Sequence, residues 1–387
     1  MDRLEHVKPS ATVGLVDKVR ELTKAGVKVI SLGIGDLMVD SPPEAKSALE
    51  MALEKGETHY VSSQGIPELR EAIVEKLRWE NSIQAEPENV IVTPGAKYAL
   101  YLGVMAMVNP GDEVIVTDPS WKTYEAIIYM AGAKPVYLPV FEKDQFRPVI
   151  KEIEKKISKK TRMVMVNTPC NPTGAVLLKE DVEGLAELAQ RHDLYVMSDE
   201  VYEKFVFDGL RNWSIASLPG MKDRTLTING FSKGWAMTGW RIGYGVANKE
   251  VVKRMTTMQE HSVTCTCAFT QRAGIAALKK SGDFVKNLIA ESVKKRDLVV
   301  DTLNRIPGIS CASPRGTFYA FSNITRTGKT DEELSLWILD KTGVITIPGS
   351  TFGEAGKGYL RVSYAIPWDQ LKEGLGKVEE AVKSLPK

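Results

Sequence analysis

The sequence predicts an α/β fold, in which helices cover both faces of a mostly parallel sheet, joined to a smaller α+β domain. Between residues 90 and 250, short apolar runs alternate with stretches of helical periodicity, such as residues 97–108 and 180–192. Apolar runs of this kind are typical of strands buried on both faces, and strands that alternate with helices favour parallel pairing. The length of 387 residues also exceeds what one hydrophobic core usually organises. The apolar runs lie at residues 90–92, 114–116, 163–166, 194–197, 226–228 and 244–246.

Both ends of the chain differ from this central pattern. The first 45 residues are rich in turn signals, including Gly33 and Gly35. A long charged helical pattern follows Gly282, and strand-like pieces at residues 317–321 and 359–364 then alternate with turns and a helix. We therefore expect a large α/β domain at residues 46–285 and a small α+β domain assembled from residues 1–45 and 286–387.

Composition excludes several classes of protein. The formal net charge of +2 gives no basic footprint for nucleic acid. No apolar run approaches the roughly 20 residues that a membrane-spanning helix needs. The N-terminus carries charges of both signs with no apolar segment behind them, so no secretory signal is expected.

The cysteines point to a reducing compartment. None of the four has the spacing of a metal ligand, so we expect no metal site. Reduced thiols in a cytoplasmic protein are the simplest interpretation. The four are Cys170, Cys265, Cys267 and Cys311.

Candidate site residues follow the apolar runs, because parallel α/β sheets bind ligands at the carboxyl ends of their strands. After residues 90–92 comes Thr93-Pro94-Gly95-Ala96-Lys97, a glycine turn that can present backbone N–H groups to an anion. Taken alone, an ordinary strand-to-helix turn is the better interpretation. Residues 163–166 are followed by a proline-fixed turn from which Asn171 can point its amide into a cleft, although an asparagine that bonds its own turn is favoured by this motif alone.

An acid ends the next apolar run, in Ser198-Asp199-Glu200-Val201-Tyr202. A carboxylate at the end of a buried strand is costly unless it has a partner. Capping a following helix is an equally good role for Asp199. Tyr202 comes one helical turn later, so we expect it either on the same side as Asp199 or in the core with its hydroxyl at the edge.

Lys233 follows the run at residues 226–228, and Arg241 comes eight positions later among glycines. Lysine is rarely buried without a function, and an amine beside a fixed arginine suits a Schiff base next to a bound phosphate. An exposed turn lysine is the ordinary alternative. The succession of a glycine turn, Asn, Asp, Tyr, Lys and Arg at strand ends is what favours a site.

Together, these motifs resemble the class I and II aminotransferases, which are pyridoxal-phosphate enzymes of the aspartate aminotransferase fold (fold type I). The resemblance covers nearly the whole chain, from Lys8-Pro9-Ser10-Ala11-Thr12 to Leu360-Arg361-Val362-Ser363-Tyr364-Ala365. It implies ping-pong transfer of an amino group from an L-amino acid to a 2-oxo acid such as 2-oxoglutarate, in a cytoplasmic homodimer with shared active sites. The motifs are Asn171-Pro172-Thr173-Gly174, Ser198-Asp199-Glu200-Val201-Tyr202, Gly230-Phe231-Ser232-Lys233 and Gly239-Trp240-Arg241-Ile242-Gly243.

The resemblance assigns a role to each candidate. Lys233 would form the Schiff base and move a proton between the substrate Cα and the cofactor C4′, for which a cationic, desolvated site should depress its pKa. Asp199 would keep the pyridine nitrogen protonated, which makes the ring an electron sink. Tyr202 and Asn171 would hydrogen-bond the ring O3′. Tyr60 would reach the phosphate bound in the partner subunit. The other expected cofactor-binding residues are Gly95, Ala96, Lys97, Trp121, Ser232 and Arg241.

The resemblance also implies that Arg361 binds the substrate α-carboxylate. This residue alternates with Leu360 and Val362, so it faces either water or the cleft, and its planar fork matches a carboxylate. Aspartate is favoured as donor only at the level of the family, because no second arginine for a side-chain carboxylate is evident. Aromatic amino acids and alanine are alternatives, and departures from the family's pattern at residues 35–38 and at Cys170 bear on this choice. The other expected substrate-binding residues are Gly35, Trp121 and Asn171.

Other functional classes fit the sequence less well. A nicotinamide-binding GxGxxG motif would need glycine at Met38, and a phosphate-binding P-loop would need Ser or Thr at Gly358. A non-catalytic regulator on this scaffold would be expected to lose Lys233 or Arg361. A β-elimination (carbon–sulfur) lyase of the same fold remains an alternative, because it shares the Cα carbanion.

Overall fold

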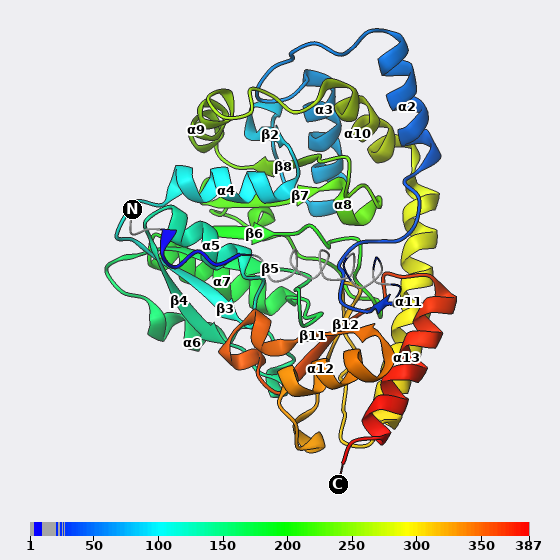
Figure 1. Cartoon of the computed structure of the whole chain (residues 1–387). Coiled ribbons are helices and arrows are strands. Elements are labelled where there is room, and N and C mark those ends of the chain that lie inside the picture. The colour runs from blue at the N-terminus through cyan, green and yellow to red at the C-terminus, as the bar shows by residue number, and fades with distance from the viewer. Residues whose placement is uncertain (1–3, 10–20, 22–23, 25, 27, 387) are drawn as a thin grey trace.

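The structure, a computed structural model, describes residues 4–9, 21, 24, 26 and 28–386. Its largest sheet has seven strands, which are β2 (Val90–Thr93), β3 (Glu113–Asp118), β4 (Lys134–Pro139), β5 (Thr161–Asn167), β6 (Tyr195–Asp199), β7 (Thr225–Gly230) and β8 (Gly243–Val246). The spatial order is β2-β8-β7-β6-β5-β3-β4 (Figure 1). Strand β8 runs antiparallel to both of its neighbours, and every other pair in this sheet is parallel. The predicted α/β class with a mostly parallel sheet is therefore confirmed.

Five of the six apolar runs lie within one of these strands, and the sixth, at residues 194–197, begins one residue before β6. The strand that sequence analysis missed is β4. Its sequence, Lys134-Pro135-Val136-Tyr137-Leu138-Pro139, has two prolines and an exposed residue at each end. Proline cannot donate to a ladder, so it is confined to edge strands, and β4 is an edge of this sheet. An edge strand of this composition lacks the continuous apolar run that identified the others.

Helices cover both faces of the sheet. Alternate strand residues face opposite sides: Val114 and Val116 pack with α4, α5 and α9, whereas Ile115 packs with α6 and α7. The described part of the chain contains no helix whose length and hydropathy would let it span a bilayer. The helices are α2 (Pro43–Glu54), α3 (Pro67–Lys76), α4 (Ala96–Met107), α5 (Thr123–Met130), α6 (Ile150–Lys156), α7 (Lys179–Arg191), α8 (Phe231–Gly234), α9 (Lys249–Glu260), α10 (Ala268–Lys280), α11 (Gly282–Arg305), α12 (Asp331–Thr342) and α13 (Trp368–Lys383).

Segments from the two ends of the chain share a core. Strand β1 (Ile30–Ser31) pairs in parallel with β10 (Val344–Ile345), and its Ile30 is buried against residues of α11, α12 and α13. A second small sheet has the order β11-β12-β9, formed by β11 (Ile347–Pro348), β12 (Tyr359–Ser363) and β9 (Tyr319–Asn323). Figure 1 shows α11 beside α13 along one edge of the molecule. The division at residues 45 and 285 remains a prediction, and residues 10–12 of the motif Lys8-Pro9-Ser10-Ala11-Thr12 lie outside the described residues.

Candidate active site

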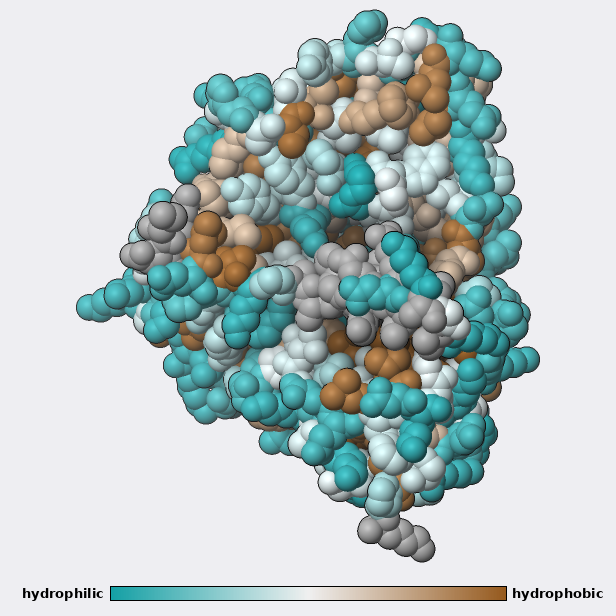
Figure 2. Space-filling view, in the orientation of Figure 1, coloured by the Kyte–Doolittle hydropathy of each residue, from teal (hydrophilic) through white to brown (hydrophobic). Residues whose placement is uncertain are grey.

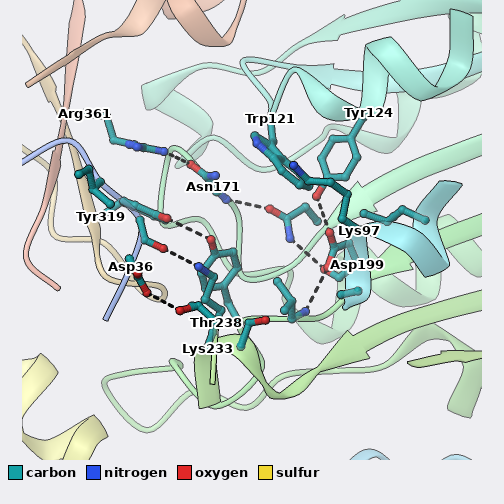
Figure 3. Close-up of a pocket in the computed structure, with 18 of the residues that line it drawn as sticks. Asp36, Lys97, Trp121, Tyr124, Asn171, Asp199, Lys233, Thr238, Tyr319 and Arg361 are labelled. Atoms are coloured by element: carbon teal, nitrogen blue, oxygen red, sulfur yellow. Dashed lines mark hydrogen bonds between the residues drawn. The ribbon is translucent and has the colours of Figure 1, made fainter. Parts of the chain in front are cut away.

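A cavity of about 350 Å³ lies where the parallel strands of the large sheet end (Figure 3). It brings together side chains from the centre of the chain with residues 33–36, Tyr319 and Arg361 from its two flanks. Gly95 lies directly before the cavity residue Ala96, and Tyr60 is 86% exposed and is not among the residues that line this cavity. The predicted residues that line it are Gly35, Ala96, Lys97, Trp121, Asn171, Asp199, Tyr202, Ser232, Lys233, Arg241 and Arg361.

Lys233 enters this cavity from α8, a single helical turn that begins directly where β7 ends. Its Nζ donates a hydrogen bond to the Gly35 carbonyl at 2.5 Å and lies 6.0 Å from the centre of the Tyr202 ring. Burial lowers the pKa of Lys233 to about 8; Asp36 opposes this shift, and the neighbouring cations Arg361, Arg241 and Lys97 add to it. The predicted direction of the pKa shift is therefore confirmed, and a substantial fraction of this amine is neutral near pH 8.

Asp199 is the last residue of β6, and its carboxylate is buried. Its Oδ2 accepts a hydrogen bond from the Tyr124 hydroxyl at 2.7 Å, and its Oδ1 accepts one from the Val201 N–H at 3.2 Å. Burial raises the pKa of Asp199 to about 6, while the hydrogen bonds from Tyr124 and Val201 and the charge of Lys233 oppose that shift. The carboxylate is thus held toward the cavity by two donors that favour its ionised form.

The helix expected after Asp199 is not present. Residues 201–204 form turns, in which the Glu203 N–H donates to the Glu200 carbonyl at 2.9 Å. Helix capping by Asp199 is therefore wrong, because its carboxylate holds the N–H of Val201 in a turn. Tyr202 still lines the same cavity as Asp199, and its hydroxyl shares a hydrogen bond of 3.1 Å with that of Tyr319.

Arg361 faces the cleft, which was one of the two orientations open to it. Leu360 and Val362 point into the core on the other face of β12, and Arg361 is only 1% exposed. Its Nη1 donates to Asn171 Oδ1 at 2.7 Å and its Nη2 donates to the Gly33 carbonyl at 2.6 Å. The guanidinium lies 4.3 Å from the centre of the Tyr319 ring, which fixes its plane. Because Asn171 Oδ1 accepts the hydrogen bond from Arg361, the Nδ2 group of the same amide points away from Arg361.

The start of α4 forms a cationic cradle. Gly95 has φ of 84°, and a Cβ at this position would approach Arg241 Nη2 to 2.5 Å, so only glycine lets the arginine lie this close. Arg241 in turn donates to the Thr238 carbonyl at 2.7 Å. Burial and the charge of Arg241 lower the pKa of Lys97, whose Nζ lies 4.7 Å from the centre of the Trp121 ring.

The charges of the cavity suit an anionic ligand. Four cationic and two acidic side chains line it, and the N–H groups at the start of α4 add positive potential. A phosphate fits beside Arg241, Ser232 and the start of α4. A protonated ring nitrogen fits beside Asp199, and an aldehyde fits at Lys233. These residues therefore fit pyridoxal phosphate.

Several cavity residues were missed from the sequence. Tyr124, which donates to Asp199, lies one helical turn after Trp121, so a search along the helix that follows β3 would have found it. Thr238 donates to Asp36 at 2.7 Å and joins residues 33–36 to the loop that carries Arg241. Tyr319 lies in a strand-like piece that carried no chemical motif, so no signal singled it out.

Comparison with known proteins gives one consistent result. The family model for aminotransferase class I and II matches residues 27–378. The chain is 42% identical to an aromatic-amino-acid aminotransferase of Thermococcus litoralis over 99% of this chain and 98% of the relative. It is equally similar, at 42% over the same shares, to an aspartate aminotransferase of Pyrococcus abyssi. The crystal structure of an aromatic aminotransferase from Pyrococcus horikoshii superposes with a TM-score of 0.90 at 42% identity, covering 94% of this chain and 98% of that one.

Proposed function

The chain belongs to the class I and II aminotransferases, and from this premise we propose that its preferred amino donor is L-aspartate and its acceptor a 2-oxo acid such as 2-oxoglutarate. It is a pyridoxal-phosphate-dependent amino-acid aminotransferase. The names of its relatives do not choose between donors, because an aspartate and an aromatic-amino-acid aminotransferase are equally similar. The choice therefore depends on the cavity.

Lys97 is the observation that supports a dicarboxylic donor. It lines the same cavity as Arg361, and within the part of the chain that the structure describes its ammonium group has no acidic partner. A substrate held at Arg361 by its α-carboxylate could neutralise this second cation with a side-chain carboxylate. An aromatic or alanine side chain would leave it unpaired.

Substitution of Lys97 by methionine tests the donor. Because one charge-assisted hydrogen bond contributes about 1.5 kcal/mol, we expect kcat/KM for aspartate to fall roughly tenfold or more, with little change for alanine and phenylalanine. The measurement is a donor panel against 2-oxoglutarate at saturating cofactor. Preference of the unmodified enzyme for phenylalanine would sink the aspartate proposal. Release of ammonia and pyruvate without an acceptor would indicate the lyase instead.

The cofactor-binding roles are proposed from the contacts above. When bound, the cofactor supplies a protonated ring that takes up the electrons left when the substrate Cα loses its proton. Asp199 would hold the proton on the ring nitrogen, while Arg241, Ser232 and the N–H groups of Gly95 and Ala96 would hold the phosphate. Trp121 would cover the ring face, and Tyr202 with the Nδ2 of Asn171 would hydrogen-bond the ring hydroxyl.

The remaining roles belong to Lys233 and the substrate-binding residues. Lys233 would attach to the cofactor aldehyde and, once released, move the proton at the substrate Cα as a neutral amine. Arg361 would bind the α-carboxylate in place of the Gly33 carbonyl that it now holds. Gly35, whose carbonyl accepts from Lys233, leaves room there, because a Cβ at this position would collide with the Tyr319 hydroxyl.

The rate at which the apoprotein captures the cofactor is expected to rise with pH, with a midpoint near 8. Burial and the surrounding cations lower the pKa of Lys233 to about 8, and only the neutral amine is a nucleophile. An ordinary lysine would place the midpoint near pH 10. Stopped-flow absorbance measures this rate, and a midpoint near 10 would show that the site does not depress the pKa.

We also propose a cytoplasmic homodimer with shared active sites and the two-domain division at residues 45 and 285. Tyr60 is almost fully exposed, as expected of a side chain that completes the site of a partner. Near the top of Figure 2 a hydrophobic patch lies over α2, where Met51 and Leu53 are exposed. Contact between two such faces would bury these side chains.

A further inference from the structure

The turn that carries Asp199 and Tyr202 has a second face. Asp199 and Tyr202 line the cavity, whereas the acids that follow each of them, Glu200 and Glu203, point into a buried polar cluster. Within the described part of the chain, the hydrogen-bond partners of these two carboxylates are not among the residues that line the cavity; they are Ser198, Ser214, Asn212, Asn81 and Lys76. The same turn therefore directs Asp199 and Tyr202 into the cavity and Glu200 and Glu203 into the buried polar cluster on its other side.

Glu200 is the centre of this cluster, and its side chain is fully buried. Its Oε1 accepts from Ser198 at 2.9 Å, and its Oε2 accepts from Ser214 at 2.5 Å, from Asn212 at 3.0 Å and from Asn81 at 3.4 Å. Four donors fix the position of this carboxyl group, and although the hydrogen bonds from Ser214 and Ser198 oppose the shift, burial raises the pKa of Glu200 to about 7. Its backbone N–H also donates to the Ile228 carbonyl at 2.8 Å, at the end of the strand that leads to Lys233.

Glu203 pins the other end of the turn. Its carboxylate forms a buried ion pair with Lys76, and its Oε2 accepts from Asn81 at 2.7 Å. Lys76 and Asn81 meet each other at 2.7 Å although they are five residues apart, a spacing that an α-helix would place on different faces. A π-helix at Leu77–Asn81 brings them together, because its hydrogen bonds span five residues.

We propose that Glu200 is a positioning residue for the active site, which acts by locking the turn at residues 199–203. This network extends to Asp199 in the cavity, because the N–H of Val201, directly after Glu200, donates to Asp199 Oδ1. If the turn relaxes, Asp199 loses one of the two donors that hold its carboxylate, and Tyr202 shifts with it. This inference rests on the proposed role of Asp199.

Two substitutions at Glu200 test this role, one that keeps the shape and hydrogen bonds of the side chain and one that removes them. Glu200→Gln keeps the shape, since its oxygen can accept from Ser214, Asn212 and Asn81 while its amide donates to the Ser198 hydroxyl. Glu200→Ala removes all four contacts. In the cofactor-saturated enzyme we expect Glu200→Ala to lower kcat about tenfold with little change in KM, and Glu200→Gln to recover most of that loss.

Hydrogen exchange of the full-length protein gives a readout that is independent of activity. Glu200→Ala should speed exchange in the peptide spanning residues 199–205, with and without cofactor, whereas Glu200→Gln should not. The matched control is Arg296→Met, which removes the ion pair between the buried Arg296 and the exposed Asp208, outside the cavity, and should lower the melting temperature without changing kcat.

The outcomes separate the inference from the proposed function. A folded Glu200→Ala protein with unchanged kcat and unchanged exchange would overturn the positioning role, and so would a Glu200→Gln variant as impaired as the alanine variant. Full activity of an Asp199→Asn variant would instead overturn the proposed role of Asp199, and the exchange at residues 199–205 would still report whether Glu200 locks the turn.

Discussion

Replacement of Lys233 by alanine is expected to abolish turnover, with kcat lower by about 10⁴-fold, while the protein stays folded. Lys233 is the amine in the cavity placed to attach to the cofactor aldehyde, and its depressed pKa also lets it accept the Cα proton near neutral pH. The cradle at Arg241 and the start of α4 should still bind the cofactor, because none of its contacts involves Lys233. The measurement is steady-state transamination, together with the melting temperature.

A matched control and a chemical test accompany this variant. Lys295 is another lysine that burial desolvates, held by the Ile366 carbonyl at 2.6 Å and not among the residues that line the cavity, so Lys295→Ala should keep its activity. Borohydride should fix the cofactor to the peptide that contains Lys233 in the unmodified enzyme and to no peptide in the variant. Repeated turnover by Lys233→Ala, or labelling of a different lysine, would remove Lys233 from its proposed role.

The fold class and most of the cavity could be predicted because both depend on local sequence. An apolar run reveals a strand buried on both faces, and the residue that ends it must lie at the edge of the sheet where ligands bind. Asn171, Asp199 and Lys233 were found in this way, and the structure brings them to one cavity. Arg361 was singled out by the resemblance to the family, and alternation placed it on the opposite face of its strand from Leu360 and Val362 without choosing between water and the cleft.

What could not be predicted depends on contacts between distant residues. The turn after Asp199 is shaped by Lys76 and Asn81, more than 115 residues away in the chain, so its local sequence resembled the start of a helix. The π-helix at Leu77–Asn81 could not be predicted either, because no local motif marks it and its Asn81 bonds Glu203, which is distant in the chain. Tyr319 was not predicted as a cavity residue for the same reason, because its hydroxyl is hydrogen-bonded to that of the distant Tyr202.

Replacement of Arg361 by lysine is expected to lower kcat/KM for amino acids about 30- to 150-fold, mainly through KM. Lysine keeps the charge but loses the planar fork, and at a site as buried as this one a charge-assisted hydrogen bond contributes at the upper end of its range, roughly 2 to 3 kcal/mol. The site is strict about this geometry, because the guanidinium is buried, bonded to Asn171 and the Gly33 carbonyl, and packed on the Tyr319 ring. Steady-state kinetics with several donors at saturating cofactor measure the loss.

A donor whose α-carboxylate is converted to an amide isolates the contact. If Arg361 binds that carboxylate, the unmodified enzyme should use the amide poorly, and Arg361→Lys should impair the amide far less than it impairs the acid, because the fork has little left to recognise. The control is Arg296→Lys, a change at another buried arginine, which pairs with Asp208 and Asp297 outside the cavity. Equal losses for the acid and the amide would mean that Arg361 supports the cavity through Asn171 and Tyr319 and does not bind the substrate.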